Sequence, residues 1–243
     1  MGLTPDAERG ATGGVAPGRI PLRRITWAAC VRTIPSRFPP IDLFERVASP
    51  GDLEAVLAVE SLTNDRLRQE AGEISLVRRE DRVTGSGAGF VMAPFTHPAP
   101  GGGRFTDGTY GAYYAARDEA TAVAETRYHR ERFMRATGQP RMELDMRLLV
   151  ARLAGELHDL RGMRAELPDI YALDDYTASQ ALGRSLRAAG SHGIAYDSVR
   201  RDGGECAAVL RPPVLSRCRQ TKHLSYLWDG ERIAHVYEKR LVV

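Results

Sequence analysis

Four polar side chains of this chain are of types that can bind or stabilise a ligand, and each stands in a distinct local context. Arg104 follows three glycines, Tyr114 comes ten residues later, Glu125 lies in the alanine-rich stretch beyond, and Ser198 ends a short apolar segment. Arginine makes bidentate, charge-assisted bonds to phosphate, and a tyrosine ring packs against a planar ring. A carboxylate fixed on a helix stabilises positive charge that develops beside it. Together these groups would hold an anionic ligand and stabilise a cation formed in it.

Each of these residues also has a structural interpretation. Arg104 reads as a surface arginine after a glycine turn, Tyr114 as a core tyrosine, and Glu125 as an exposed partner of a histidine one turn on, His129. Ser198 is either a turn serine or a hydrogen-bonding group for a substrate, because no GxSxG motif supports a serine nucleophile. On a strand Tyr114 and its neighbour would face opposite sides.

Several common sites are excluded by their motifs. Residues 85–89 read GxGxG, whereas the dinucleotide-binding motif is GxGxxG followed by a helix. Residues 91–98 contain two prolines and are expected not to open a helix. The dinucleotide-binding motif is therefore not met. No GK[ST] phosphate loop is present. The three cysteines form no CxxC, and neither HxxxH nor HExxH occurs, so we predict no metal site.

Composition narrows the class of protein. The 243 residues are 43% hydrophobic and 27% charged, enough to bury a sizeable core. No run of 18 apolar residues occurs, which excludes a transmembrane helix. The net charge is only +3. A GC-rich coding genome would explain the excess of arginine over lysine equally well. We therefore predict neither nucleic acid nor a membrane as a partner. Three cysteines and no apolar leader favour the cytoplasm.

The elements that must position the four side chains follow from the hydrophobic pattern. Residues 1–22 are expected to be a flexible leader and 23–243 a single domain, with a helical insertion at about 45–100. The fold class is α+β, a mixed and largely antiparallel sheet with flanking helices. Predicted strands cover 28–34, 110–115, 142–149, 194–199 and 206–210, a hairpin covers 224–237, and helices cover 49–70, 117–138 and 176–189. Asp174 or Asp175 would cap the last helix rather than act as an acid–base pair.

The chain resembles the RES family, named after an arginine, a glutamate and a serine. The resemblance covers about residues 27–216 and is carried by Gly102–Phe105, Tyr114–Ala116, the helix that reaches Glu125, and Tyr196–Arg200. Arg32 resembles the family's other N-terminal arginine, although the stretch from there to Arg104 is longer than in compact members.

The resemblance implies a fold similar to ADP-ribosyltransferase toxins and an enzyme that destroys NAD. Arg104, Glu125 and Ser198 would then be catalytic, and Arg32, Arg104 and Tyr114 would bind NAD. NAD would be cleaved at the nicotinamide–ribose bond, by hydrolysis or with inorganic phosphate as second substrate, and no cofactor would be needed. The implied role is the toxin of a toxin–antitoxin pair, neutralised by a separate antitoxin with a helix-turn-helix.

Two alternatives stay open at this point. The same fold could transfer ADP-ribose to a macromolecule, because the acceptor is chosen by access to the pocket and not by the cleavage residues. A catalytically inactive binding module is the second alternative. The oligomeric state is also open, with a homo-oligomer among the options.

Overall fold

Seven strands form one sheet in the computed structural model, which describes residues 17–36, 44–45, 49, 51–52, 72–240 and 242. Their order is β1-β2-β5-β4-β3-β6-β7, and β1 also pairs with β3, so five of them close into a ring. Only the β3–β4 pairing is parallel. The strands are β1 (Leu22–Pro35), β2 (Tyr113–Ala116), β3 (Met142–Asp159), β4 (Gly193–Asp197), β5 (Glu205–Val209), β6 (Leu215–Trp228) and β7 (Ile233–Lys239).

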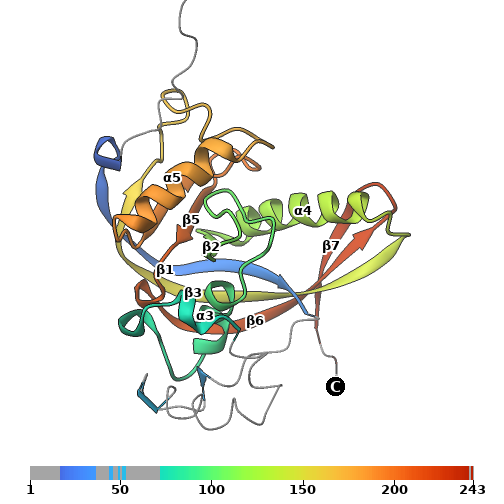
Figure 1. Ribbon diagram of the computed structural model, residues 1–243. Coiled ribbons are helices and arrows are strands. Elements are labelled where there is room, and N and C mark those ends of the chain that lie inside the picture. Colours follow the sequence, from blue (N-terminus) through green and yellow to red (C-terminus); the bar gives the residue numbers. More distant parts are fainter. Residues whose placement is uncertain are drawn as a thin grey trace, which may run out of the picture.

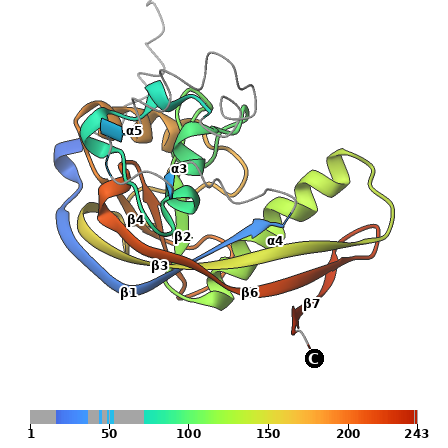
Figure 2. The same cartoon turned by 90° about the horizontal axis from the view of Figure 1, so that it is seen from below.

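Helices cover both sides of the long strands. In Figure 1, α4 (Glu119–Ala136) and α5 (Thr177–Ala188) lie on one side of β1 and β3, and α3 (Ala88–Thr96) lies on the other. Figure 2 shows β1, β3 and β6 running side by side as long curved strands. Four short 3₁₀ turns complete the described elements: η1 (Pro17–Arg19), η3 (Ile74–Leu76), η4 (Arg79–Asp81) and η5 (Pro212–Val214). The predicted mixed, largely antiparallel α+β class is confirmed.

The core has two parts, one on each side of β2. Met92 and Phe95 of α3 pack with Tyr113 in the first cluster, which the strands enclose. Met134 of α4 and Leu182 of α5 belong to the second cluster, and Tyr114 packs against it. Successive side chains of a strand point to opposite faces, so the two tyrosines separate as the alternation predicts.

The strands are longer than the sequence pattern indicated. The expected strand at 142–149 continues to Asp159, because β3 pairs with β1 along one edge and with β6 along the other. Register shifts opposite β6 interrupt the alternation of apolar residues that the prediction relied on. The hairpin of β6 and β7 is confirmed.

The expectation that residues 91–98 cannot open a helix was wrong. α3 runs from Ala88 to Thr96 with Pro94 inside it. Proline removes one backbone donor from a helix, but six of the nine α3 residues are buried, and this packing compensates for the lost bond. The Pro94 carbonyl lies against Gly111, where a Cβ would come within 1.7 Å of that oxygen.

Parts of two further predictions lie outside the described residues. These are most of the helix expected at 49–70 and the first 16 residues of the expected leader. Ser49 does accept the backbone N–H of Asp52 at 3.2 Å, as a helix cap would. β1 begins at Leu22, the last residue of that leader. No helix in the described ranges has the length and apolar character needed to cross a membrane.

Candidate active site

A serine and a glutamate from distant parts of the chain meet directly. α4 is capped by Asp118, whose carboxylate accepts the backbone N–H of Thr121 at 2.8 Å, and Glu125 lies in the second turn of this helix. Ser198 follows the last residue of β4 and is 2% exposed. Its Oγ donates to Glu125 Oε1 at 2.6 Å. Two of the predicted catalytic residues, one on α4 and one in the turn after β4, are therefore brought together.

Backbone groups fix the direction of the Ser198 hydroxyl. The N–H groups of Arg200 and Arg201 both donate to Ser198 Oγ at 3.1 Å. A hydroxyl has two lone pairs and one proton, so with both lone pairs engaged its proton is left to Glu125. The Ser198 N–H in turn donates to the Gly204 carbonyl at 2.8 Å, which closes the turn.

The other oxygen of Glu125 has no partner among the described residues, and it does not bond to His129. Cys206 Sγ lies 4.0 Å from Oε1, the same oxygen that Ser198 holds. Burial, and then the charge of Glu125, raise the pKa of the Cys206 thiol, and burial also raises the pKa of the Tyr196 phenol. Cys206 and Tyr196 therefore stay neutral. Because Oε2 of Glu125 has no partner among the described residues, it is available to a ligand.

Arg104 is a buried cation held by a tight turn. Gly102 has φ +65°, and a Cβ there would lie 2.0 Å from the Thr106 carbonyl oxygen, so the turn requires glycine. Arg104 is 6% exposed, and its Nη1 donates to the carbonyls of Ile170 and Ala172 at 2.9 Å each. Its guanidinium carbon lies 4.7 Å from the centre of the Tyr176 ring.

Within the described part of the chain, no carboxylate lies within ion-pair distance of Arg104. A buried charge without a counter-ion is costly, and in proteins such charges are paired or bind a ligand. Carbonyl dipoles and a ring face offset only part of this cost. The arrangement favours an anionic ligand at Arg104.

Tyr114 supports the turn that carries Arg104. Its hydroxyl accepts the backbone N–H of Phe105 at 2.9 Å and lies 3.3 Å from Thr106 Oγ1. Gly103 lies against the ring, where a Cβ would come within 2.9 Å of the phenol oxygen. Burial raises the pKa of Tyr114. Its predicted contact with NAD stays a prediction, since these contacts are with the protein itself.

Tyr196 lies close to both Arg104 and Glu125. Burial is the main cause that raises its pKa, Cys206 and the charge of Glu125 raise it further, and the positive charge of Arg104 lowers it. Its ring also meets the ring of Phe105, the residue after Arg104, edge to face at 5.1 Å. A hollow of about 240 Å³ opens beside Ser198, lined also by Arg164, Asp197 and Asp202, but neither Arg104 nor Glu125 lines it.

Arg32 is not part of this group. Its register partner on β3 is Leu149, which belongs to the cluster under α3. Its guanidinium lies over Tyr113 at 4.9 Å and donates to the Tyr114 carbonyl at 2.9 Å, and burial lowers its pKa. These contacts hold β1 against β2, and the predicted role of Arg32 in binding NAD stays a prediction.

Four residues that the sequence analysis did not assign to the site surround it. Tyr128 lies three residues after Glu125 on α4, a spacing that places two side chains on one helix face. The Arg200 guanidinium lies over its ring at 3.3 Å, and Asp174 accepts its hydroxyl. Of the two candidate caps, Asp175 accepts the Thr177 N–H at 2.9 Å, leaving Asp174 for Tyr128. The helix spacing could have found Tyr128, but no local signal marks Asp174 or Tyr176.

Among the described residues no three histidine, cysteine or acidic side chains gather in a way that could hold a metal ion. The three cysteines are free and buried. The side chains that gather at the site are those of arginine, tyrosine, serine, glutamate and aspartate.

The chain is similar to known proteins over most of its length. Residues 79–229 match the family described as RES domain. An uncharacterized protein, y4oC, of Sinorhizobium fredii (strain NBRC 101917 / NGR234) is 35% identical over 206 residues, which are 85% of each chain. A chain of the M. tuberculosis MbcT–MbcA toxin–antitoxin complex is 15% identical with a TM-score of 0.44, covering 82% of this chain and 86% of that one.

Proposed function

The chain belongs to the RES domain family, and from this premise we propose that it degrades NAD by cleaving the nicotinamide–ribose bond. The observation that carries the proposal is the 2.6 Å bond from buried Ser198 to Glu125. It leaves one oxygen of Glu125 without a partner among the described residues, and the charges of Glu125 and of the buried Arg104 both act on the phenol of Tyr196. A fixed negative group and an uncompensated positive group suit a ligand that has a pyrophosphate and a cationic ring.

The reaction needs few groups from the protein. The bond between C1″ of the nicotinamide-bearing ribose and the nicotinamide nitrogen breaks, and its electron pair neutralises the positively charged ring as nicotinamide leaves. Positive charge develops on the ribose, as in the oxocarbenium-like transition state of glycoside cleavage. Water or inorganic phosphate then forms the new bond to C1″, yielding ADP-ribose or its 1″-phosphate, and water's second proton passes to solvent.

Each residue has a task in this scheme. Glu125 places negative charge beside the developing cation or binds a ribose hydroxyl through Oε2. Ser198 is a positioning residue, because its hydroxyl is engaged by Glu125 and by two backbone N–H groups. Arg104 binds the pyrophosphate. NAD is a substrate here, and the scheme requires no metal or prosthetic group.

The biological role that we propose is that of a toxin. Depleting NAD would harm a cell, so a partner antitoxin would have to bind this chain and block the site. This part of the proposal rests on the resemblance to the family and not on a contact in the structure.

Release of nicotinamide from NAD by the purified protein tests the proposal. The assay is run with and without inorganic phosphate, and the sugar product is identified by mass spectrometry. ADP-ribose 1″-phosphate would indicate phosphorolysis, ADP-ribose would indicate hydrolysis, and labelled protein or nucleic acid in a cell extract would indicate transfer. Absence of nicotinamide release under every condition would refute the proposal.

A further inference from the structure

One short segment provides acceptors for both arginines that flank the Glu125–Ser198 pair. The carbonyls of Ile170 and Ala172 bond Arg104, and the carbonyl of Leu173 with the carboxylate of Asp174 receives Arg200. We call residues 170–174 the strap. Its last two residues are exposed at the surface, by 54% for Leu173 and 71% for the Asp174 side chain.

The Arg200 end of the strap is built like a binding position. The Arg200 side chain is 11% exposed, and its Nε is buried without a partner among the described residues. Its guanidinium covers the ring of Tyr128, and the Tyr128 hydroxyl donates to Asp174. Asp174 Oδ1 lies 3.6 Å from Arg200 Nη2, beyond good hydrogen-bond distance. The phenol therefore bonds the Asp174 carboxylate, while the guanidinium beside it donates to the Leu173 carbonyl and has an unpaired Nε.

This position adjoins the proposed catalytic carboxylate by two routes. Tyr128 and Glu125 are three residues apart on the same face of α4. The backbone N–H of Arg200 bonds the hydroxyl of Ser198, which itself holds Glu125. A group bound by the Arg200 guanidinium and the Tyr128 hydroxyl would therefore belong to the same ligand as a group at Glu125.

The strap is weakly held at this end. Leu173 and Asp174 donate no backbone hydrogen bond to the described main chain. The Tyr128 hydroxyl and then the charge of Arg200 lower the pKa of Asp174, so it is ionised at neutral pH. A single exposed carboxylate is a weaker partner for an arginine fork than a phosphate group, which offers more oxygens and more charge.

We propose that Arg200 and Tyr128 form a second phosphate-binding position of the site, occupied in this structure by the carboxylate of Asp174. The inference rests on the proposed function, since it assigns this position to a phosphate of the same ligand. It predicts that the ligand's phosphate displaces Asp174 and that Asp174 competes with binding. The phosphate group belongs either to the dinucleotide or to free inorganic phosphate.

Ligand binding by an Asp174→Asn variant tests the inference. Asparagine keeps the size of the side chain and can still accept the Tyr128 hydroxyl, but it removes the competing charge. Isothermal titration is carried out with ADP-ribose, which lacks the bond to be cleaved, and separately with inorganic phosphate. We expect Asp174→Asn to bind one of these ligands about tenfold more tightly than the wild type, corresponding to about 1.4 kcal/mol.

Asp175→Asn is the matched control, because Asp175 is the adjacent exposed aspartate and contacts neither Tyr128 nor Arg200; it should bind as the wild type does. Combining Arg200→Gln with Asp174→Asn should abolish the gain. Tighter binding of ADP-ribose alone would identify the dinucleotide phosphate as the occupant, and tighter binding of phosphate alone would identify the second substrate. Unchanged affinity for both ligands, or an equal gain in Asp175→Asn, would overturn the inference.

The titration is independent of turnover. If Asp174→Asn binds more tightly but no variant releases nicotinamide, the phosphate position stands and the proposed reaction fails. If NAD is cleaved and the titration shows no difference, the reaction stands and the phosphate position fails.

Discussion

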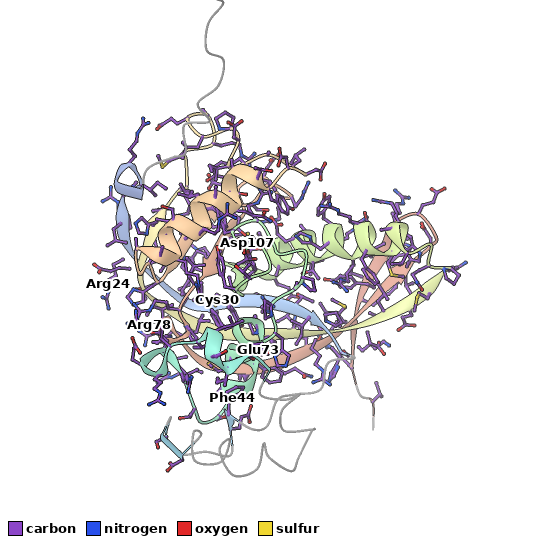
Figure 3. The ribbon with its side chains drawn as sticks, viewed as in Figure 1. Arg24, Cys30, Phe44, Glu73, Arg78 and Asp107 are labelled. Atoms are coloured by element: carbon purple, nitrogen blue, oxygen red, sulfur yellow. The ribbon has the colours of Figure 1, made fainter. Side chains whose placement is uncertain are left out.

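The two sides of β2 carry similar residues in different settings. On one side the Arg32 guanidinium lies over the Tyr113 ring. On the other side the Arg104 guanidinium lies over the Tyr176 ring, and the turn that carries Arg104 is bonded to the Tyr114 hydroxyl. Both arginines donate to backbone carbonyls. In Figure 3 the label Cys30 marks β1, the strand that carries Arg32, and the label Asp107 marks the turn that carries Arg104.

The two sides of β2 differ in one carboxylate, Glu125, and in the groups that surround it. α4 brings Glu125 to the Arg104 side, and a strap with an exposed end covers that arginine. The Arg32 side has α3 and an apolar cluster around Tyr113. Among the described residues neither arginine has a carboxylate within ion-pair distance, so the difference lies in the Glu125–Ser198 pair and in the strap. In our proposal, an arginine over a tyrosine is a packing contact on the Arg32 side and a binding group on the Arg104 side.

The largest expected effect comes from removing the carboxylate. Glu125→Gln keeps the Ser198 bond but loses the charge, so nicotinamide release should fall about 100- to 1,000-fold, as for other groups that stabilise transition-state charge. Glu119→Gln is the control on the same helix, since Glu119 pairs with Lys222 and not with the site. Equal turnover of both variants would remove Glu125 from the mechanism.

Exchanging the two arginines for lysine tests the comparison directly. Arg104→Lys should raise KM for NAD about tenfold to a hundredfold, because charge-assisted bonds worth roughly 1.5–3 kcal/mol lose their fork geometry. Arg32→Lys should instead lower the melting temperature and leave kcat/KM within about threefold, an effect below 1 kcal/mol. A KM that rises as much for Arg32→Lys would place both sides of β2 in one site, as the family resemblance implies.

A smaller effect is expected at the serine. Ser198→Ala frees Glu125 to rotate and leaves the N–H groups of Arg200 and Arg201 without their acceptor. We expect kcat to fall about tenfold and the free energy of unfolding to drop by roughly 1–3 kcal/mol. Ser216→Ala, at an exposed position of β6, should change neither quantity. Loss of all activity with unchanged stability would instead indicate that Ser198 acts on the substrate.

The smallest effect concerns the turn that carries Arg104. The pKa of Asp107 is lowered from an ordinary 3.8 to about 2, and the hydrogen bond from the Thr109 hydroxyl is the largest cause. A carboxyl whose pKa is lower in the folded state stabilises the protein above its unfolded pKa, and this contribution disappears as the pH falls through the folded value. Asp107→Asn should therefore lower the melting temperature by a few degrees, about what a partly exposed ion pair and its hydrogen bonds contribute.

Thermal unfolding of both proteins between pH 2 and pH 7 measures this. The difference between them should be constant above about pH 5 and shrink progressively as the pH falls, to a small part of that value at pH 2. A difference as large at pH 2 as at pH 7 would mean that the Asp107 charge does not stabilise the turn.

Local patterns were sufficient for much of the fold. The Asp118 cap and the glycine near 138 bracket α4, and the Asp-Gly turn marks the β6–β7 hairpin, because capping and turn formation depend on neighbours in the sequence. The separation of Tyr113 from Tyr114 also followed from strand alternation. Where burial overrides propensity, as at Pro94 in α3 and in the second half of β3, these patterns were insufficient.

The types of the site residues, and the order in which they occur, were determined by the sequence alone: Arg104, Tyr114, Glu125 and Ser198 each stand in a recognisable local context. Only the tertiary structure decided which of them touch. Ser198 reaches Glu125 across 73 residues, and the strap reaches Arg104 across more than 60. Such contacts depend on how β4 and the strap pack against α4 and the turn, and no short-range pattern encodes a distance between elements so far apart in the chain.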